Sequence, residues 1–150
     1  MGKKQPIRAV LDTNLFISGL FSSSGSVAKL QQLWLSGVFE LVVSEEILEE
    51  IGETLQKVYI QKQLRLKPEE RIGVLELIRE KASIVTKDRY KTDRIVEDPD
   101  DNKFLSCALE AKANYVVSGD SHLLSLKHFH TIQIVDAATF IRAMERTTVR

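Results

Sequence analysis

Four acidic residues, spread over more than a hundred positions, are the side chains of this sequence best suited to chemistry: Asp12, Glu50, Asp101 and Asp120. Each lies at or soon after the junction of an apolar, strand-like run with a loop or helix. In an open α/β sheet such junctions face one crevice at the carboxyl ends of the strands. Carboxylates gathered there repel one another and require a cation. Oxygen ligands favour Mg²⁺ or Mn²⁺, so the pattern predicts a hard-metal site suited to phosphate ester chemistry.

Helical geometry singles out Glu50 from a segment rich in glutamate, residues 45–53. At about 100° per residue, the apolar residues of this segment form one stripe along a helix. Glu50 lies roughly 110° from the centre of that stripe, closer than Glu46, Glu49 or Glu53. It is therefore the acid expected to lean into an interior cleft, and a solvated position at the boundary of the stripe is the alternative.

The segment EDPDDNKFLSCA, residues 97–108, contains the third acid. Asp98 and Pro99 are typical of a turn, and a helix is predicted to begin near residue 101. Asp101 falls within roughly 40° of the centre of the apolar face of that helix. A carboxylate directed at the packed side is costly unless it is paired, hydrogen-bonded or metal-bound. Capping of the helix is the alternative role for Asp101, and Asp98 and Asp100 are weaker candidates for the site.

The other two acids also have structural alternatives. Asp12, in VLDTN, could form a turn with its own backbone, and Asn14 could take part in that turn or bind the carboxylate. Asp120, in VVSGD, could cap a short following helix. Ser118 could donate a hydrogen bond to a carboxylate. Each structural alternative is credible for its own residue. All four acids are nevertheless expected at the same end of the sheet, and a metal site accounts for this shared position.

The composition is that of an ordinary globular protein. The chain has 150 residues, 43% of them hydrophobic, with Lys+Arg and Asp+Glu both numbering 21. This length suits a single domain, and the zero net charge neither favours nor excludes a nucleic-acid partner. The single cysteine, Cys107, excludes an internal disulfide and a thiolate zinc site. The polar start of the chain and the lack of a long apolar run predict no secretion signal and no membrane span, so we expect a cytoplasmic protein.

Apolar strand-like runs alternate with helical patterns, which predicts a parallel sheet covered by helices on both faces. The predicted strands are 7–11, 39–43, 83–86, 115–118 and 131–135. The predicted helices are 24–35, 45–58, 68–82, 101–112, 121–127 and 137–145. The Ser/Gly-rich stretch 18–26 is interpreted as a loop flanked by Phe16 and Phe21, and Trp34 and Phe39 are expected in the core.

Taken together, these motifs resemble the PIN-domain family, the fold of the VapC-type toxin ribonucleases. The motifs are VLDTN at 10–14, ILEEI at 47–51, DPDDNKFLSCALEAKANYVVSGD at 98–120 and HLL at 122–124. The resemblance covers nearly the whole chain in order and spacing. It is strongest to the branch described as PIN-family toxin components of toxin–antitoxin systems.

The resemblance implies a three-layer α/β/α sandwich, formed by residues 1–150 as one domain, with a five-stranded parallel sheet in the order 3-2-1-4-5. It places the acidic quartet of the family on Asp12, Glu50, Asp101 and Asp120, and the small polar partners on Thr13, Asn14 and Ser118. It also implies an Mg²⁺- or Mn²⁺-dependent ribonuclease that forms a homodimer and is inhibited by a cognate antitoxin.

An acidic site repels phosphate, so basic residues must attract an RNA substrate. The preferred set leads into the acidic loop and comprises Lys87, Arg89, Lys91 and Arg94, with Tyr90 among them. A second set comprises Lys57, Lys62, Arg65 and Lys67, with Tyr59. Solvated surface is the alternative for both sets.

Two rival functions follow from the same residues. A phosphatase with Asp12 as covalent nucleophile would typically carry a second acid two residues on, where this chain has Asn14. A non-catalytic module of the same fold that binds RNA or a partner protein is the stronger rival. Metal binding separates the cases, because a binding module has no need of a cation at the four acids. His128 and His130 are expected at the surface, since no third soft ligand accompanies them. His122, close to Asp120 in the sequence, is expected either to contact substrate or to lie at the surface.

Overall fold

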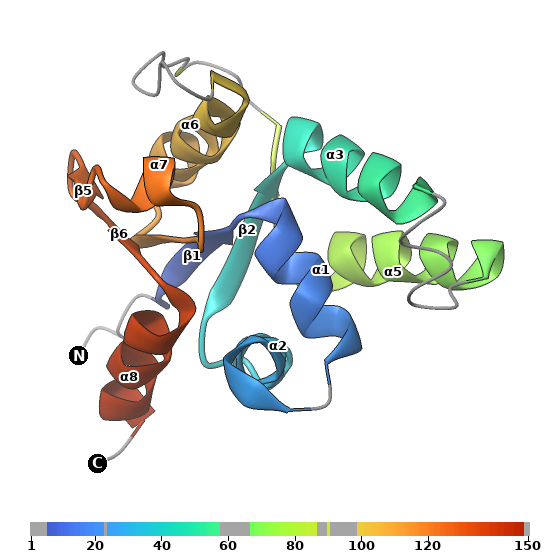
Figure 1. The fold of residues 1–150 in the computed structure, drawn as a ribbon, viewed down its shortest axis with the longest axis horizontal. Helices are drawn as coiled ribbons and strands as arrows, with labels where there is room; N and C mark the ends of the chain where they lie inside the picture. The colour runs from blue at the N-terminus through green and yellow to red at the C-terminus, as the bar shows by residue number, and fades with distance from the viewer. Residues whose placement is uncertain (1–5, 23, 58–66, 87–89, 91–98, 149–150) are drawn as a thin grey trace, which may run out of the picture.

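A six-stranded sheet forms the centre of the protein (Figure 1). The structure is a computed structural model and describes residues 6–22, 24–57, 67–86, 90 and 99–148. The strand order is β3-β2-β1-β4-β6-β5. The strands are β1 (Arg8–Leu11), β2 (Glu40–Ser44), β3 (Ser83–Val85), β4 (Tyr115–Val117), β5 (His128–Phe129) and β6 (Ile132–Val135).

Five of these strands are parallel neighbours in the order β3-β2-β1-β4-β6, which confirms the predicted order 3-2-1-4-5. The prediction omitted β5, which pairs antiparallel with β6 at one edge of the sheet. This strand has only two residues, and Lys127 and His130 on either side of it have positive φ angles of 63° and 56°. Such a tight reversal leaves too few residues for an alternating pattern to be visible in the sequence.

Helices cover both faces of the sheet, as expected for parallel strands (Figure 1). Helix α6 packs across β1, β2 and β4, and α1 and α2 pack together on the other side, where α2 also contacts α8. No helix of the described residues is long and apolar enough to cross a membrane. The helices are α1 (Thr13–Phe21), α2 (Gly25–Leu35), α3 (Glu45–Gln56), α5 (Pro68–Lys81), η1 (Pro99–Asp101), α6 (Asn102–Ala111), α7 (Ser121–Leu124) and α8 (Ala137–Thr148).

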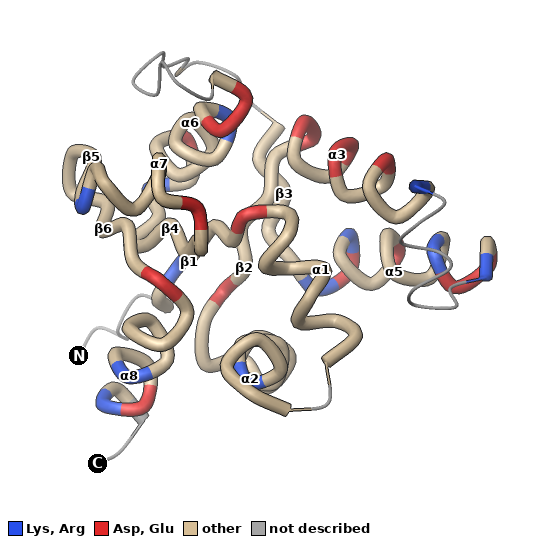
Figure 2. The backbone as a smooth tube through the Cα atoms, in the orientation of Figure 1, with Lys and Arg blue, Asp and Glu red and all other residues tan. Residues whose placement is uncertain are grey.

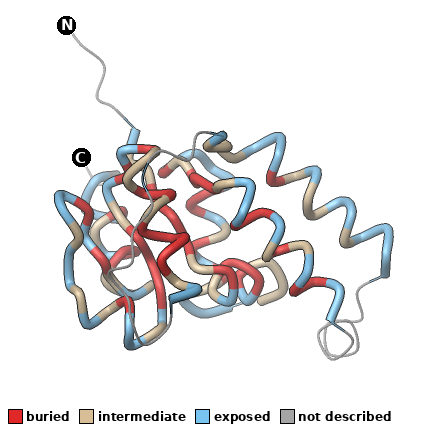
Figure 3. The backbone as a smooth tube through the Cα atoms, turned by 90° about the horizontal axis from the view of Figure 1, so that it is seen from above, coloured by how far each residue is buried: buried red, intermediate tan, exposed pale blue. Residues whose placement is uncertain are grey.

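The core lies between the sheet and these helices, where the burial map shows the central strands almost entirely buried (Figure 3). Trp34 and Phe39 are buried, which confirms their predicted place in the core. Phe39 meets Phe140 of α8 edge to face, with 5.0 Å between ring centroids. Aromatic contacts of this kind fix how α8 lies against the sheet.

Helix α1 was not predicted, because its sequence TNLFISGLF leads into a Ser/Gly-rich stretch. The Asp12 side chain caps the helix by accepting a hydrogen bond from the Leu15 amide at 2.8 Å. Phe16, expected to flank a loop, is buried and lies edge to face with Trp34 of α2 at 5.6 Å. Tertiary packing against α2 therefore overrides the weak helix propensity of this segment.

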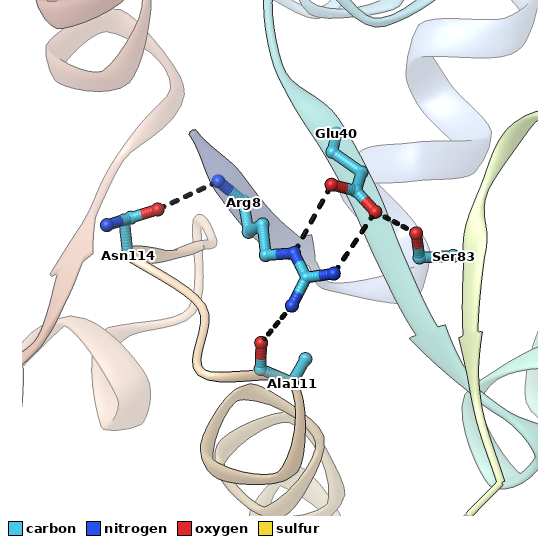
Figure 4. Close-up of polar contacts among 5 residues, drawn as sticks. All are labelled: Arg8, Glu40, Ser83, Ala111 and Asn114. Carbon is cyan, nitrogen blue, oxygen red and sulfur yellow. Dashed lines mark hydrogen bonds and ion pairs between the residues drawn. The ribbon is translucent and has the colours of Figure 1, made fainter. Parts of the chain in front are cut away.

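Arg8 ties together four elements at the amino ends of the strands, opposite the ends where the acids were expected (Figure 4). Its guanidinium donates to both carboxylate oxygens of Glu40 on β2, at 3.2 and 3.5 Å, and to the Ala111 carbonyl at the end of α6, at 2.6 Å. The Ser83 hydroxyl of β3 donates to the same Glu40 carboxylate. Arg8 thus satisfies a carbonyl that the end of α6 would otherwise leave without a partner.

We expect Arg8→Met to lower the free energy of unfolding by about 1–2 kcal/mol, because it removes a charged donor from both Glu40 and the end of α6. Arg79→Met is the matched control, since Arg79 and Glu45 form an ion pair of which both side chains are 55% exposed. The control should cost less than about 0.5 kcal/mol. Urea unfolding monitored by circular dichroism measures both, and equal costs would contradict a special role for Arg8.

Candidate active site

A pocket of about 510 Å³ opens at the carboxyl ends of β1 and β4. All four acids singled out from the sequence line it, three of them aspartates and the fourth Glu50. Acidic segments gather where α1, α6 and α7 begin (Figure 2). The lining residues are Asp12, Thr13, Asn14, Leu15, Ser18, Glu50, Asp101, Phe104, Gly119 and Asp120.

The three aspartates reach the pocket because each directly precedes a helix. Asp12 is the N-cap of α1, Asp101 that of α6 and Asp120 that of α7. The parallel pairing of Leu11 with Val117 brings the ends of β1 and β4 side by side. Helix α6 then adds Asp101 from the face it covers. The positive ends of the α1 and α6 dipoles favour negative charge at this point.

Asp12 lies deepest in the pocket. Its Oδ1 accepts from the Leu15 amide at 2.8 Å, and its Oδ2 accepts from the Ser118 hydroxyl. Burial raises the pKa of Asp12 above its ordinary value, although the hydrogen bonds from Ser118 and Leu15 oppose this effect. The charge of Asp120 raises it further. Asp12 therefore caps α1 and also lines the pocket, so its structural role does not exclude a role in the site.

Asp101 and Asp120 lie within hydrogen-bonding reach of each other, and this contact holds the pKa of Asp120 below its ordinary value. Asp101 makes no side-chain capping hydrogen bond to α6. One oxygen of Asp120, Oδ2, is buried without a hydrogen-bond partner in the part of the chain that the structure describes. Two neighbouring carboxylates and a buried oxygen of this kind call for a proton or a cation between them.

Glu50 is the only glutamate of α3 that is not exposed, as the helical geometry predicted. It belongs to a different set of contacts from the aspartates. Its Oε1 accepts from the Thr13 hydroxyl, and its Oε2 accepts from the Lys103 ammonium. Thr13 is itself buried, so Glu50 is fixed against the wall of the pocket.

Lys103 contacts Glu50 of the site, and the sequence did not reveal this contact. Its side chain is 7% exposed, which is rare for lysine, and it also lies 3.5 Å from Asp100. Burial alone would lower the pKa of Lys103, but the Glu50 carboxylate and the charge of Asp100 outweigh it and leave the pKa raised. The only hint in the sequence is a lysine placed between buried positions of α6.

The donor set fits a hard cation, although among the described residues no three His, Cys, Asp or Glu side chains lie close enough together to hold an ion as they stand. Asp12, Asp101 and Asp120 offer carboxylate oxygens only, which suits Mg²⁺ or Mn²⁺. Asp120 Oδ2, which is buried and has no hydrogen-bond partner among the described residues, is the atom that a cation would satisfy.

Several predicted residues lie elsewhere. Asp98 and the basic set Lys87, Arg89, Lys91 and Arg94 fall outside the described residues, as do Lys62, Arg65 and Tyr59. His122 Nδ1 is 4.0 Å from Asp120 Oδ1, at the rim of the site. Cys107 is a buried free thiol, and burial raises its pKa to about 12, which makes it a poor nucleophile.

Comparison with known sequences identifies the family to which this chain belongs. The sequence profile of the PIN domain matches residues 8–122, and the chain belongs to the PIN domain family. The uncharacterized protein MJ1680 of Methanocaldococcus jannaschii is similar to it. The two are 33% identical over 125 residues, which cover 83% of this chain and 78% of that protein.

Solved structures share the fold. A chain in the crystal structure of VapBC2 from Rickettsia felis, bound to a DNA fragment from their promoter, superposes with a TM-score of 0.59. It is 15% identical, and the match covers 87% of this chain and 98% of that chain. A chain of DNA-bound VapBC from Salmonella typhimurium superposes with a TM-score of 0.54 at 18% identity, over the same shares of the two chains. These likenesses confirm the predicted fold class.

Proposed function

We propose that this PIN-domain protein is an Mg²⁺- or Mn²⁺-dependent ribonuclease that hydrolyses RNA phosphodiester bonds. The observation that carries the proposal is the convergence of three aspartates on one pocket, with a buried oxygen of Asp120 that has no partner among the described residues. A carboxylate cluster without its cation would cost the fold stability, and such a cost is usual at functional sites. Membership of the PIN domain family supports the same reading.

Asp12, Asp101 and Asp120 would hold the cation, with Asp98 as a further candidate. When bound, the cation would neutralise charge on the scissile phosphate and lower the pKa of water. Ser118 fixes the Asp12 carboxylate by hydrogen bonding, and Asn14 lines the pocket beside it. Glu50, held by Thr13 and Lys103, would orient the attacking water as a fixed negative charge.

An RNA strand would reach the acids with help from the basic set Lys87, Arg89, Lys91 and Arg94. These residues lie in the sequence between β3 and η1, and η1 ends at Asp101 on the rim of the pocket. Basic residues next to an acidic pocket would bind the RNA backbone and leave the scissile phosphate to the cation.

We further propose that residues 1–150 act as a single nuclease domain, as a homodimer in the cytoplasm and as the toxin of a toxin–antitoxin pair. The support is the fold shared with chains of VapBC structures from two bacteria. A cognate antitoxin would inhibit the nuclease by covering the pocket. A non-catalytic PIN module that binds RNA or a partner is the alternative.

The test is cleavage of a fluorophore–quencher RNA by purified protein, with Mn²⁺ and with EDTA. Asp101→Asn and Asp120→Asn should each reduce cleavage by about 100-fold or more, because they remove charge from the cation site. Asp136→Asn is the matched control: Asp136 caps α8 by accepting from the Thr139 amide at 2.8 Å, away from the pocket. Cleavage that persists in EDTA, or that survives both pocket substitutions unchanged, would refute the proposal, and RNA binding without cleavage would favour the alternative.

A further inference from the structure

Lys103 places a positive charge beside Glu50, one of the acids that line the pocket. The residue lies in the first turn of α6, two positions after Asp101, and its side chain is 7% exposed. Its ammonium contacts Glu50 Oε2 and lies 3.5 Å from Asp100 Oδ2. Asp100 is 81% exposed, so Glu50 is the partner that holds the charge inside the protein.

The contacts divide the four acids into two sets. Asp120 interacts with both Asp12 and Asp101, so the aspartates form one electrostatic group. Both oxygens of Glu50 are engaged by other residues, Thr13 on one and Lys103 on the other. A cation bound by Glu50 would therefore have to share an oxygen with the Thr13 hydroxyl or lie close to the Lys103 ammonium.

We propose that Lys103 takes the place of a second cation, so that the pocket binds one divalent ion at the three aspartates and Glu50 stays outside its coordination shell. The inference rests on the proposed function, because it concerns the same cation. Four ionised carboxylates are then met by three positive charges, two from the ion and one from the lysine. A second divalent ion would have to displace the ammonium from Glu50 or lie close to it, and like charges at that distance repel strongly. Lys103 is therefore a positioning residue for Glu50.

The rival explanation is that Lys103 and Glu50 form an ordinary structural ion pair with no influence on the cation. The two explanations differ in what happens when the lysine charge is removed. If Lys103 only stabilises the fold, its loss changes the free energy of unfolding and leaves the number of bound ions unchanged. If it stands in for a cation, its loss opens a second ion site at Glu50.

Mn²⁺ binding to the whole protein without RNA distinguishes these cases, with free Mn²⁺ measured by electron paramagnetic resonance. We expect one ion per chain for the wild type and two for Lys103→Met, which keeps the apolar stem and removes the charge. Lys29→Met removes a charge from the exposed face of α2 and should leave one ion. The double variant Glu50→Gln/Lys103→Met removes both charges of the pair, so it leaves no unpaired buried charge to prevent folding. It should bind one ion, with an affinity within about threefold of the wild type.

Each outcome of this experiment either supports or overturns the inference that the pocket binds one ion. Two ions in the wild type, or one in folded Lys103→Met, would overturn the inference while leaving the proposed ribonuclease intact. A loss of affinity of tenfold or more in the double variant would make Glu50 a ligand of the first ion and also overturn it. Absence of Mn²⁺ binding in every protein would overturn both the inference and the metal dependence of the proposed function. One-ion binding without RNA cleavage would support the inference and refute the ribonuclease alone.

Discussion

Asp12→Asn is expected to abolish function and yet stabilise the protein in the absence of metal. RNA cleavage should fall by about 100-fold or more, because the substitution removes the deepest carboxylate of the cation site. Addition of Mn²⁺ should raise the melting temperature of the wild type, as any ligand of the folded state does, but not that of the variant. The metal-free variant should melt about 2–5 °C higher than the metal-free wild type.

The stabilisation follows from the burial of Asp12. Its pKa is raised from an ordinary value of 3.8, so the ionised form is less favourable in the folded than in the unfolded chain. The resulting loss of stability is present above the folded-state pKa and disappears as the pH falls below 3.8. Asparagine is neutral at every pH and caps a helix as well as aspartate does. The advantage of the variant should therefore be full at pH 7 and absent at about pH 3.

Differential scanning fluorimetry across this pH range, with and without Mn²⁺, measures the effect. Asp136→Asn is again the control, since it makes the same change at a cap outside the pocket. An Asp12→Asn variant that is less stable than the wild type at pH 7 without metal would show that the carboxylate is needed by the fold itself. That result would remove the argument that the buried charge of Asp12 requires a cation.

Gly19→Ala should be among the most destabilising single-methyl changes in the protein. A Cβ atom at this position of α1 would lie 2.7 Å from the backbone carbonyl oxygen of Val27 in α2. Backbone atoms cannot swing aside as a side chain can, so α1 and α2 would have to separate. Overpacking of this kind costs about 2–3 kcal/mol, and the midpoint of urea unfolding should fall accordingly.

Gly73→Ala is the matched control, because Gly73 is also helical but has nothing within 4 Å of the added methyl group. Alanine is the better helix former by about 1 kcal/mol, so this variant should gain stability. The same chemical change is therefore predicted to have opposite signs at the two positions. If Gly19→Ala were neutral or stabilising, the close approach of α1 to α2 would not be a fixed contact.

The strands and the main helices could be predicted from the sequence because their signals are local. Apolar runs such as ELVVS of β2 end at residues that start helices, and parallel pairing follows from their alternation with helical segments. Glu50 was selected among neighbouring glutamates by angle alone, and the structure leaves it as the partly buried one. The order of the strands came from the family resemblance rather than from these patterns.

What the sequence did not predict depends on contacts between distant residues. Helix α1 contains Gly19, a poor helix former, because α2 approaches it too closely for any side chain. A lysine such as Lys103 is normally exposed, and its burial depends on Glu50, 53 positions away in the sequence. Neither contact can be predicted from the pattern of a single segment, because periodicity indicates only which face of an element is apolar.

The three aspartates of the site lie at helix starts, where uncharged residues can also serve. The site could therefore be lost in evolution without loss of the fold. Asparagine, serine and threonine can serve at the cap of α1, and Asp101 makes no capping bond that a replacement would break. Mutational drift could therefore remove the charges one by one while the protein remained folded and able to bind partners. A chain under no selection for the charge would be expected to accumulate such neutral caps. Because helix caps do not require the charge, Asn substitution at these three starts separates the role of the carboxylate from that of the cap.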